Sequence, residues 1–453
     1  IAVSCADECT IFGERTFFDL PAAGAGFLGF TNVATKATLC GQCHARPQAE
    51  WRRTAHAAAW GDLQASGGAR GLCEDCHTVG PLGNEAPASS GWAGTRDARY
   101  HDVQCESCHG PGETHVAKPD ASQPLASLAV GVDLSSGCGE CHRGTHHPFV
   151  EDWSRSRHAT VVDFAAARED CRSCHSGQGA LDAWGVRGPY VERDAASPLP
   201  ITCGVCHDPH DATNVHQLRF PVATTSIQEH LCARCHDRRS VPDPSSAHGL
   251  APHAPEAALL AGDAGWFPPG LDFDRGDIVG THGTGANPEL CAGCHVSRFT
   301  VTDPSSGSFV TEATGHLFEA LPCVDAAGTP VGGDCPITTT ARSFQACAAS
   351  GGCHASEGAA AGALSAASAR IEAAAADLIA MLAQVDPNLE AAGGEIDAGS
   401  STFTVAEGAF FNWNLATFGG SVTGSAVHNP FLSEALLLAS VQAVSDEYGI
   451  PIP

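Results

Sequence analysis

The chain is poor in the apolar side chains that ordinarily fill a protein core. Aromatic residues make up 6% of its 453 residues, and it has one methionine and three tyrosines. It also has 50 glycines and 28 prolines, so much of the backbone is expected in loops and turns. The length would suit two or three ordinary domains, but the composition does not fit ordinary cores.

Basic residues are scarce as well. The chain has 24 Lys and Arg against 51 Asp and Glu, a net charge of −27. Such a surface repels nucleic acid and anionic lipid, which excludes both as partners, and leaves basic proteins, cations or mineral surfaces. The alternative is that the charge only keeps the protein soluble. No stretch of eighteen apolar residues occurs, so we expect no membrane-spanning segment.

Cysteine and histidine, by contrast, are abundant, with 22 and 23 copies. In Cys40-Gly41-Gln42-Cys43-His44, two cysteines stand two residues apart and a histidine follows at once. This is the attachment sequence of a c-type haem, in which both sulfurs form thioethers and the histidine binds the iron. The composition gives roughly 0.05 chance occurrences of this pattern, and the chain has eight. Zinc ribbons also use Cys-x-x-Cys pairs, but they need no histidine after each pair.

A ninth site is stretched. Cys347 and Cys353 flank five residues, and His354 follows. A longer loop can satisfy the same chemistry, whereas the alternative is a disulfide with a surface histidine. We expect nine haems, which supply the missing apolar bulk. The haem thioethers are expected at Cys40, Cys43, Cys73, Cys76, Cys105, Cys108, Cys138, Cys141, Cys171, Cys174, Cys203, Cys206, Cys232, Cys235, Cys291, Cys294, Cys347 and Cys353. The proximal iron ligands are expected to be His44, His77, His109, His142, His175, His207, His236, His295 and His354.

Four cysteines remain outside these sites. Their even number predicts the disulfides Cys5–Cys9 and Cys323–Cys335 in an oxidising compartment. The sequence starts at Ile1 with no initiator methionine and no basic n-region. We therefore interpret it as a mature form whose secretion signal has been removed.

The attachment motifs repeat in groups of three. First cysteines at 40, 73 and 105 recur 98 residues later at 138, 171 and 203, and Trp51–Ala57 parallels Trp153–Ala159. This indicates an internal duplication of a three-haem unit, in which neighbouring haems stack because no unit can bury a haem alone. The expected segments are an N-terminal arm (1–35), a seven-haem segment (36–240), a two-haem loop-rich segment (241–356) and a C-terminal helical segment (357–453). The arm either packs on a neighbouring molecule or covers the first haem.

Two helices are expected near the C-terminus. Residues 357–385 are rich in alanine and carry one apolar residue every seven positions, at Leu364, Ile371, Leu378 and Val385. A last helix should begin with Asn429 as N-cap and Pro430 at its first position, and end near Gly449. The predicted fold class is irregular loops and short α-helices wrapped around a chain of stacked haems, with a C-terminal helical hairpin and little β-structure.

The ligand on the second face of each iron decides function. An iron with two protein ligands carries electrons, whereas an open face can bind and transform a substrate. Fourteen histidines lie outside the motifs, and the sole methionine, Met381, falls in an apolar helix. We therefore expect bis-histidine haems of low potential. The distal candidates are His56, His115, His147, His158, His210, His253, His282, His316 and His428, with His101, His216, His230 and His248 in reserve.

Most of residues 36–453 resembles the large multihaem c-type cytochromes of bacteria that respire with external electron acceptors. The resemblance is carried by Cys105–His115, by Cys138–His142 with His146-His147-Pro148, by Trp153–Ala159, by Cys203–His210 and by residues 411–430. It implies electron transfer outside the cytoplasm, at the outer surface or, as second choice, in the periplasm. Some of these cytochromes polymerise into filaments whose subunits exchange axial histidines, and the stretched ninth site resembles what they tolerate.

The ending also resembles the nitrite reductase and hydroxylamine oxidoreductase superfamily. The chain has no Cys-x-x-Cys-Lys motif, which weakens an enzymatic interpretation. We therefore expect an electron conduit, with a reductase or oxidase that has one open haem as the alternative. The expected partners are redox proteins or extracellular acceptors and further copies of the chain, in a filament with haem contact between subunits.

Overall fold

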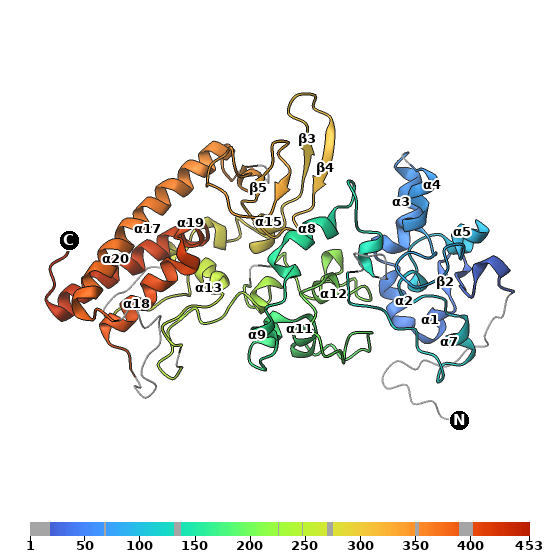
Figure 1. The fold of residues 1–453 in the computed structure, drawn as a ribbon, viewed down its shortest axis with the longest axis horizontal. Helices are drawn as coiled ribbons and strands as arrows, with labels where there is room; N and C mark the ends of the chain where they lie inside the picture. The colour runs from blue at the N-terminus through green and yellow to red at the C-terminus, as the bar shows by residue number, and fades with distance from the viewer. Residues whose placement is uncertain are drawn as a thin grey trace. The chain divides into compact units, whose positions relative to one another are not determined.

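The structure is a computed structural model that describes residues 19–67, 69–130, 137–224, 226–246, 248–269, 275–348, 353–388 and 402–453. Short helices and long loops dominate the described residues, and their strands form three two-stranded sheets (Figure 1). This confirms the predicted fold class. Cys5 and Cys9 lie outside the described residues. Among the described helices, none is both long enough and apolar enough to cross a bilayer.

The chain divides into two compact units. Unit 1 comprises residues 1–221, 300–302 and 306–317, and unit 2 comprises 222–299, 303–305 and 318–453. The first unit therefore ends earlier than the segment boundary that we placed at residue 240, and it takes in a later piece of the chain.

Unit 1 is built from short helices. Its α-helices are α1 (Cys40–Cys43), α2 (Ala45–Trp51), α3 (Ala59–Ala65), α4 (Gly71–Glu74), α5 (Trp92–Thr95), α6 (Cys105–His109), α7 (Glu113–Ala117), α8 (Phe149–Arg155), α9 (Asp163–Ala166), α10 (Arg172–His175), α11 (Gly177–Ala183) and α12 (Cys203–Cys206). Its 3-10 turns are η1 (Ala22–Gly24), η2 (Ala55–Ala58), η3 (Asp75–His77), η4 (Ala98–Tyr100), η5 (Cys138–Glu140), η6 (Arg157–Ala159) and η7 (Val215–Gln217). The strands β1 (Phe30–Asn32) and β2 (Ala37–Thr38) pair antiparallel, and β3 (Phe299–Thr302) pairs with β4 (Phe309–Ala313).

Many attachment motifs open a helical turn, as α1, α6 and α12 do at their first cysteine. Residues i and i+3 of a helix share one face. The turn therefore places both sulfurs of a motif on the same side, with the histidine directly after them.

The apolar core of unit 1 consists of small separate clusters. In one of them Phe27 and Tyr100 are completely buried beside Val79 and Trp92. The Tyr100 hydroxyl donates to the Phe27 carbonyl oxygen at 2.9 Å. The described end of the N-terminal arm is thus part of this core.

The internal duplication is visible in the hydrogen bonds. The indole N–H of Trp51 donates to the Val103 carbonyl at 2.8 Å, and that of Trp153 donates to the Ile201 carbonyl at 2.8 Å. The Val103 N–H in turn donates to the His56 carbonyl at 3.1 Å, and the Ile201 N–H donates to the His158 carbonyl at 3.1 Å. The two three-haem units therefore share local structure as well as sequence.

Unit 2 contains the long helices. Its helices and turns are η8 (Cys232–Arg234), α13 (Glu256–Ala261), α14 (Arg275–Ile278), η9 (Thr281–Gly283), α15 (Cys291–His295), α16 (Gln345–Ala348), α17 (Glu357–Val385), α18 (Val405–Ala416), η10 (Phe418–Gly420), α19 (Thr423–His428) and α20 (Pro430–Tyr448). The strands β5 (Cys323–Val324) and β6 (Pro330–Val331) pair antiparallel.

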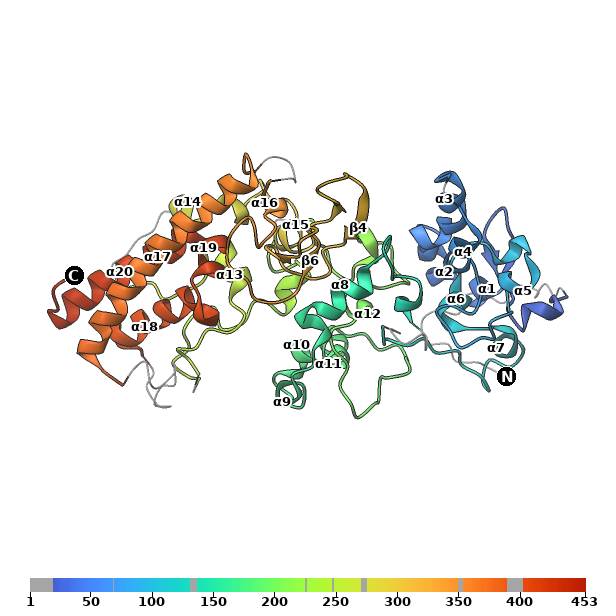
Figure 2. The same cartoon turned by 45° about the horizontal axis from the view of Figure 1, so that its top comes forward.

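Helices α17 and α20 pack against each other, as predicted, but a third helix joins them (Figure 2). Helix α18, which we did not predict, packs on both and buries Phe410 and Phe411. Its first turn is fixed by a capping box between Thr404 and Glu407. The expected hairpin is therefore part of a three-helix core, and this core is the largest apolar cluster in the described chain.

Asn429 fixes the start of α20. Its side-chain oxygen accepts from the Leu432 N–H at 3.1 Å, and its amide nitrogen donates to the Leu259 carbonyl at 3.1 Å. The side chain is completely buried, and the helix ends at Gly449 with a φ of 67°. Both ends agree with the predicted helix, and the cap fixes the neighbouring His428.

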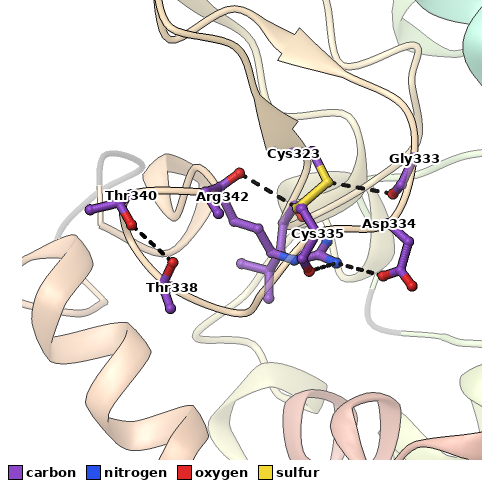
Figure 3. Close-up of a disulfide and its surroundings, with 9 residues drawn as sticks. Cys323, Gly333, Asp334, Cys335, Thr338, Thr340 and Arg342 are labelled. Carbon is purple, nitrogen blue, oxygen red and sulfur yellow. Dashed lines mark hydrogen bonds and ion pairs between the residues drawn. A yellow bond between two sulfur atoms is a disulfide. The ribbon is translucent and has the colours of Figure 1, made fainter.

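Cys323 and Cys335 form a disulfide, the pairing that the sequence predicts (Figure 3). The Arg342 guanidinium lies beside it and donates to the carbonyls of Leu321 at 2.7 Å and Cys335 at 2.9 Å. It also forms an ion pair with Asp334 at 3.7 Å. The disulfide and Arg342 together close the β5–β6 segment that precedes the ninth motif.

Candidate haem-binding sites

We number the sites by their first cysteine: site 1 at Cys40, site 2 at Cys73, site 3 at Cys105, site 4 at Cys138, site 5 at Cys171, site 6 at Cys203, site 7 at Cys232, site 8 at Cys291 and site 9 at Cys347. Thiols of different sites lie within hydrogen-bonding reach in four pairs, namely Cys40 with Cys105, Cys76 with Cys141, Cys138 with Cys203, and Cys232 with Cys291. Sites 1 and 3, 2 and 4, 4 and 6, and 7 and 8 are therefore direct neighbours.

Four of the motif histidines are held in the orientation that an iron ligand needs. Their Nδ1 atoms lie at hydrogen-bonding distance from a backbone carbonyl: His77 from Ala59 (2.8 Å), His109 from Pro124 (3.0 Å), His207 from His216 (2.8 Å) and His295 from Phe318 (2.9 Å). A carbonyl accepts only, so Nδ1 carries the proton. The lone pair is then on Nε2, where it can bind a metal.

Six motif histidines have a second histidine ring opposite them. The ring centres are separated by 6.4 Å for His44 and His115, 5.8 Å for His109 and His210, 6.1 Å for His142 and His56, 6.4 Å for His207 and His316, 6.1 Å for His295 and His428, and 6.2 Å for His354 and His282. An iron bound at about 2 Å by two opposite imidazole nitrogens separates the ring centres by about 6 Å. The spacing therefore fits one iron between each pair.

The second members of these pairs are oriented in the same way. Nδ1 lies next to a carbonyl oxygen in His115 (Ser122, 2.5 Å), His282 (Val427, 2.7 Å), His316 (Thr314, 3.1 Å) and His428 (Gly424, 2.8 Å). At sites 6 and 8 both facing rings are held like this. Their Nε2 lone pairs are available to the same metal, so the residues present fit a haem iron.

Burial keeps two of the paired histidines, His142 and His428, neutral. It lowers the pKa of His142 to about 4, with a smaller contribution from the neighbouring His56. It also lowers the pKa of His428 to about 4, and the nearby His295 lowers it further. Near neutral pH these rings are therefore in the form that donates a lone pair to a metal.

Some of these second histidines face a motif other than the one nearest to them in the sequence. His115 faces site 1, although it directly follows site 3. His316 faces site 6, although it follows site 8 in the sequence. His210 faces site 3, although it follows site 6. Tertiary contacts determine these partners.

Three further distal candidates lie elsewhere. His147 lies in the loop before α8. The lowered pKa of His142 is caused mainly by burial, and His147 is close enough to lower it a little more. His158 lies in η6, at the place in the duplication that matches His56, and His253 lies in the loop before α13. They stay candidates for the remaining sites.

The reserve histidine His230 has a different role. It is completely buried, its Nε2 donates to the Glu289 carbonyl at 3.2 Å, and its Nδ1 accepts from the Cys232 N–H at 3.1 Å. Both nitrogens are therefore used, so His230 is not a distal ligand. One of its ring nitrogens lies within 4.8 Å of the sulfurs of Cys232 and Cys291. Because these cysteines belong to sites 7 and 8, the cluster is not a separate metal site.

His77 at site 2 differs from the paired motif histidines. Within the part of the chain that the structure describes, no other histidine ring faces it at the spacing seen in the six pairs. The reserve histidine His101 lies nearby, but its ring stacks on Trp60 at 4.1 Å and packs against Trp92 at 4.9 Å.

Asp152 positions the distal side of site 6. Its buried carboxylate accepts from the N–H of Thr314 at 2.9 Å and from its hydroxyl at 2.6 Å, and the Thr314 carbonyl holds His316. In Asp152→Ala both buried donors lose their acceptor. We expect a loss of about 2–4 kcal/mol in unfolding free energy and partial opening of site 6. Thermal unfolding and electron paramagnetic resonance (EPR) measure the two effects.

The exposed Asp62 on α3 provides the matched control, because Asp62→Ala removes a carboxylate from the same unit without a buried partner. This variant should leave both measurements unchanged. A low-spin spectrum and unaltered stability in Asp152→Ala would contradict the positioning role of Asp152.

Comparison with known proteins agrees with these sites. Residues 39–110 match the family described as cytochrome c554 and c-prime, and residues 198–241 match the doubled CXXCH motif. These two segments contain sites 1–3 and sites 6 and 7. The chain is also similar to the multiheme cytochrome MtrA of Shewanella baltica (strain OS185), with 28% identity over 162 residues, 31% of this chain and 44% of that protein. It thus spans less than half the length of this relative.

The fold is similar to that of the outer cell wall cytochrome OcwA. The crystal structure of OcwA superposes with a TM-score of 0.56 over 92% of this chain and 100% of that chain, at 16% identity. Identity this low shows a shared fold alone. The repeated attachment motifs, the two family matches and the similarity to MtrA together support a multihaem c-type cytochrome.

Proposed function

We propose that the protein conducts electrons over a long distance through nine covalently bound haems, with two histidine ligands at most of them. The six facing histidine pairs carry this proposal. An iron with both axial positions filled by protein exchanges electrons without binding a substrate. The stretched ninth site is included because His354 has His282 opposite it, as the regular sites have their partners.

The contacts between attachment sites support a continuous path inside each unit. In unit 1, site 1 adjoins site 3 and site 4 adjoins site 6 through neighbouring thiols. Cys108 of site 3 lies close to Cys138 of site 4, which links the two pairs. In unit 2, site 7 adjoins site 8, and Cys294 of site 8 lies close to Cys347 of site 9. Haems anchored at adjacent sulfurs must have their edges close together.

The proposed setting is outside the cytoplasm, at the outer surface, with an extracellular acceptor or a redox protein as partner. The similarity to MtrA and to OcwA, which is named for the outer cell wall, supports this setting. The net charge of −27 favours basic partner proteins or mineral surfaces. Association of several chains into a filament would extend the path, and electron microscopy of native material tests it. Monodisperse single particles would contradict the filament.

The alternative function is that of a reductase or oxidase with one open haem. The arrangement at His77 favours it, because the ring of the nearest spare histidine, His101, stacks on Trp60 and, among the described residues, no other histidine ring faces His77. Turnover of nitrite, hydroxylamine or tetrathionate with a reduced dye tests it, and no turnover of any of them argues against an enzyme.

The haem count and the spin state test the main proposal. Mass spectrometry of the intact protein should give nine haems per chain, and low-temperature EPR of the oxidised protein should be dominated by low-spin ferric signals. The reason is that two imidazoles give a strong ligand field. High-spin signals from several irons per chain would contradict conduction through bis-histidine haems. A count of eight haems would remove site 9 from the path.

A further inference from the structure

We propose that the haem at site 2 keeps one iron face open and binds a small neutral molecule there. The inference rests on the proposed attachment of haem to Cys73 and Cys76. It deepens the alternative function, because it assigns the open iron to one named site and the ligand to one chemical class.

His77 has the features of a proximal ligand. It ends η3 directly after Cys76, and its Nδ1 lies 2.8 Å from the Ala59 carbonyl, so its Nε2 carries the lone pair. In this respect it matches His109, His207 and His295. Those three have a second histidine ring opposite, whereas His77 has none among the described residues.

The nearest spare histidine is held away from this role. His101 forms a β-bridge with Thr78, and its ring lies nearly parallel to that of Trp60, with 4.1 Å between ring centres and 12° between planes. Trp92 packs against both rings, and its indole N–H donates to Glu74 at 3.2 Å. The aromatic stack is therefore fixed at both ends. Turning His101 toward the iron would break the stack.

The start of the attachment helix at site 2 is exposed to solvent. Leu72, directly before Cys73, is 77% exposed, and Gly71 is exposed beside it. The described residues of α4 thus lie at the surface of unit 1.

The charges around site 2 select the class of ligand. Glu74 is neutralised by Arg96, whose guanidinium lies 2.6 Å from its carboxylate. The adjacent Asp75 has no ion pair with a described residue, and the whole chain carries −27. The exposed Arg70 directly before α4 balances Asp75, so the nearby side chains give no net positive charge that would attract an anion. Neutral ligands with a donor atom for iron, such as carbon monoxide, nitric oxide or hydroxylamine, therefore fit the site.

Site 2 is connected to the proposed path. The sulfur of Cys76 lies within hydrogen-bonding reach of Cys141 at site 4, which itself adjoins site 6 through Cys138 and Cys203. Electrons that move along unit 1 can therefore reach the open iron from a neighbouring haem. Site 2 is a side branch at which a bound molecule meets the path.

Titration of the reduced protein with carbon monoxide tests the inference, and EPR of the oxidised protein supports it. We expect one carbon monoxide bound per chain and one high-spin ferric iron per chain. Cys73→Ala combined with Cys76→Ala should remove one haem and abolish both signals. The matched control is Cys171→Ala with Cys174→Ala at the duplicated position, site 5, which should also remove one haem but keep the carbon monoxide site.

Three outcomes would overturn the inference. Nine haems without carbon monoxide binding would mean that a protein ligand occupies the second axial position at site 2. The conduit proposal would remain intact. Persistence of binding in the site 2 variant would place the open iron elsewhere. Binding that disappears as protein concentration rises would mean that a second copy supplies the missing histidine. An unmodified peptide at Cys73 and Cys76 would instead contradict the haem attachment on which the proposed function depends.

Discussion

His56→Ala is expected to add one high-spin ferric iron per chain to the EPR spectrum while all haems stay attached. The His56 ring faces His142 at 6.1 Å, and no sulfur of site 4 is touched by the change. The thioethers of Cys138 and Cys141 therefore hold the haem, and its iron loses one of two axial ligands. Mass spectrometry checks the attachment, and the spectrum checks the ligation.

The position of site 4 makes this variant informative about conduction. Site 4 adjoins site 2 through Cys141, site 3 through Cys138, and site 6 through Cys203. Loss of an imidazole changes the potential of the haem at this junction. We expect slower passage of electrons through unit 1, which rapid mixing with an oxidant measures as slower reoxidation of the other haems.

His146→Ala is the matched control for His56→Ala. His146 is exposed, its ring stacks on Phe309 at 5.1 Å, and it belongs to none of the six facing pairs. We expect no new high-spin iron. A fully low-spin spectrum in His56→Ala would mean that His56 is not a ligand or that another histidine replaces it.

Glu106→Ala is expected to lower the unfolding free energy of the protein by about 3–9 kcal/mol. The buried carboxylate accepts from the N–H groups of Leu28 at 2.9 Å, Gly29 at 2.7 Å and Gly112 at 2.7 Å. Alanine leaves three buried donors without an acceptor, and each costs about 1–3 kcal/mol. Denaturant unfolding measures the loss. Glu85→Ala, which removes an exposed carboxylate from the same region, should change little.

The same carboxylate makes stability depend on pH. Burial raises the pKa of Glu106 to about 7, against the opposing effect of its three N–H donors. The folded pKa lies above the unfolded value, so its contribution is complete below about pH 4.5 and is lost as pH rises through about 7. Wild type should therefore lose about 3 kcal/mol relative to Glu106→Gln over this range. Parallel unfolding curves for the two proteins at every pH would contradict this.

Local sequence is enough to predict the attachment sites, because their chemistry requires cysteines and a histidine close together in the chain. It was not sufficient for the distal ligands. His316 reaches site 6 because Asp152 binds Thr314 across a long stretch of sequence, and no local pattern encodes that contact. The chain has more spare histidines than sites, so their number did not indicate that His77 would have no facing ring among the described residues. A count of histidines does not say which ring faces which motif.

The C-terminal helices show the same limit in the fold. The regular apolar repeat predicted α17 to its last residue, and Asn429-Pro430 predicted the start of α20. Helix α18 was missed, although Thr404 and Glu407 form a capping box that signals a helix start. Its apolar residues lie close together without the seven-residue spacing of α17, because it is covered on more than one side.

Iron bound between the histidine pairs would hold the protein together after its backbone is cut. With a haem at each pair, six loops are closed, from 44 to 115, 56 to 142, 109 to 210, 207 to 316, 282 to 354 and 295 to 428. Consecutive loops overlap, so every peptide bond between His44 and His428 lies inside at least one of them. A protease that cuts this backbone once leaves two fragments still joined through iron, and the cut cytochrome stays in one piece until the axial bonds are broken.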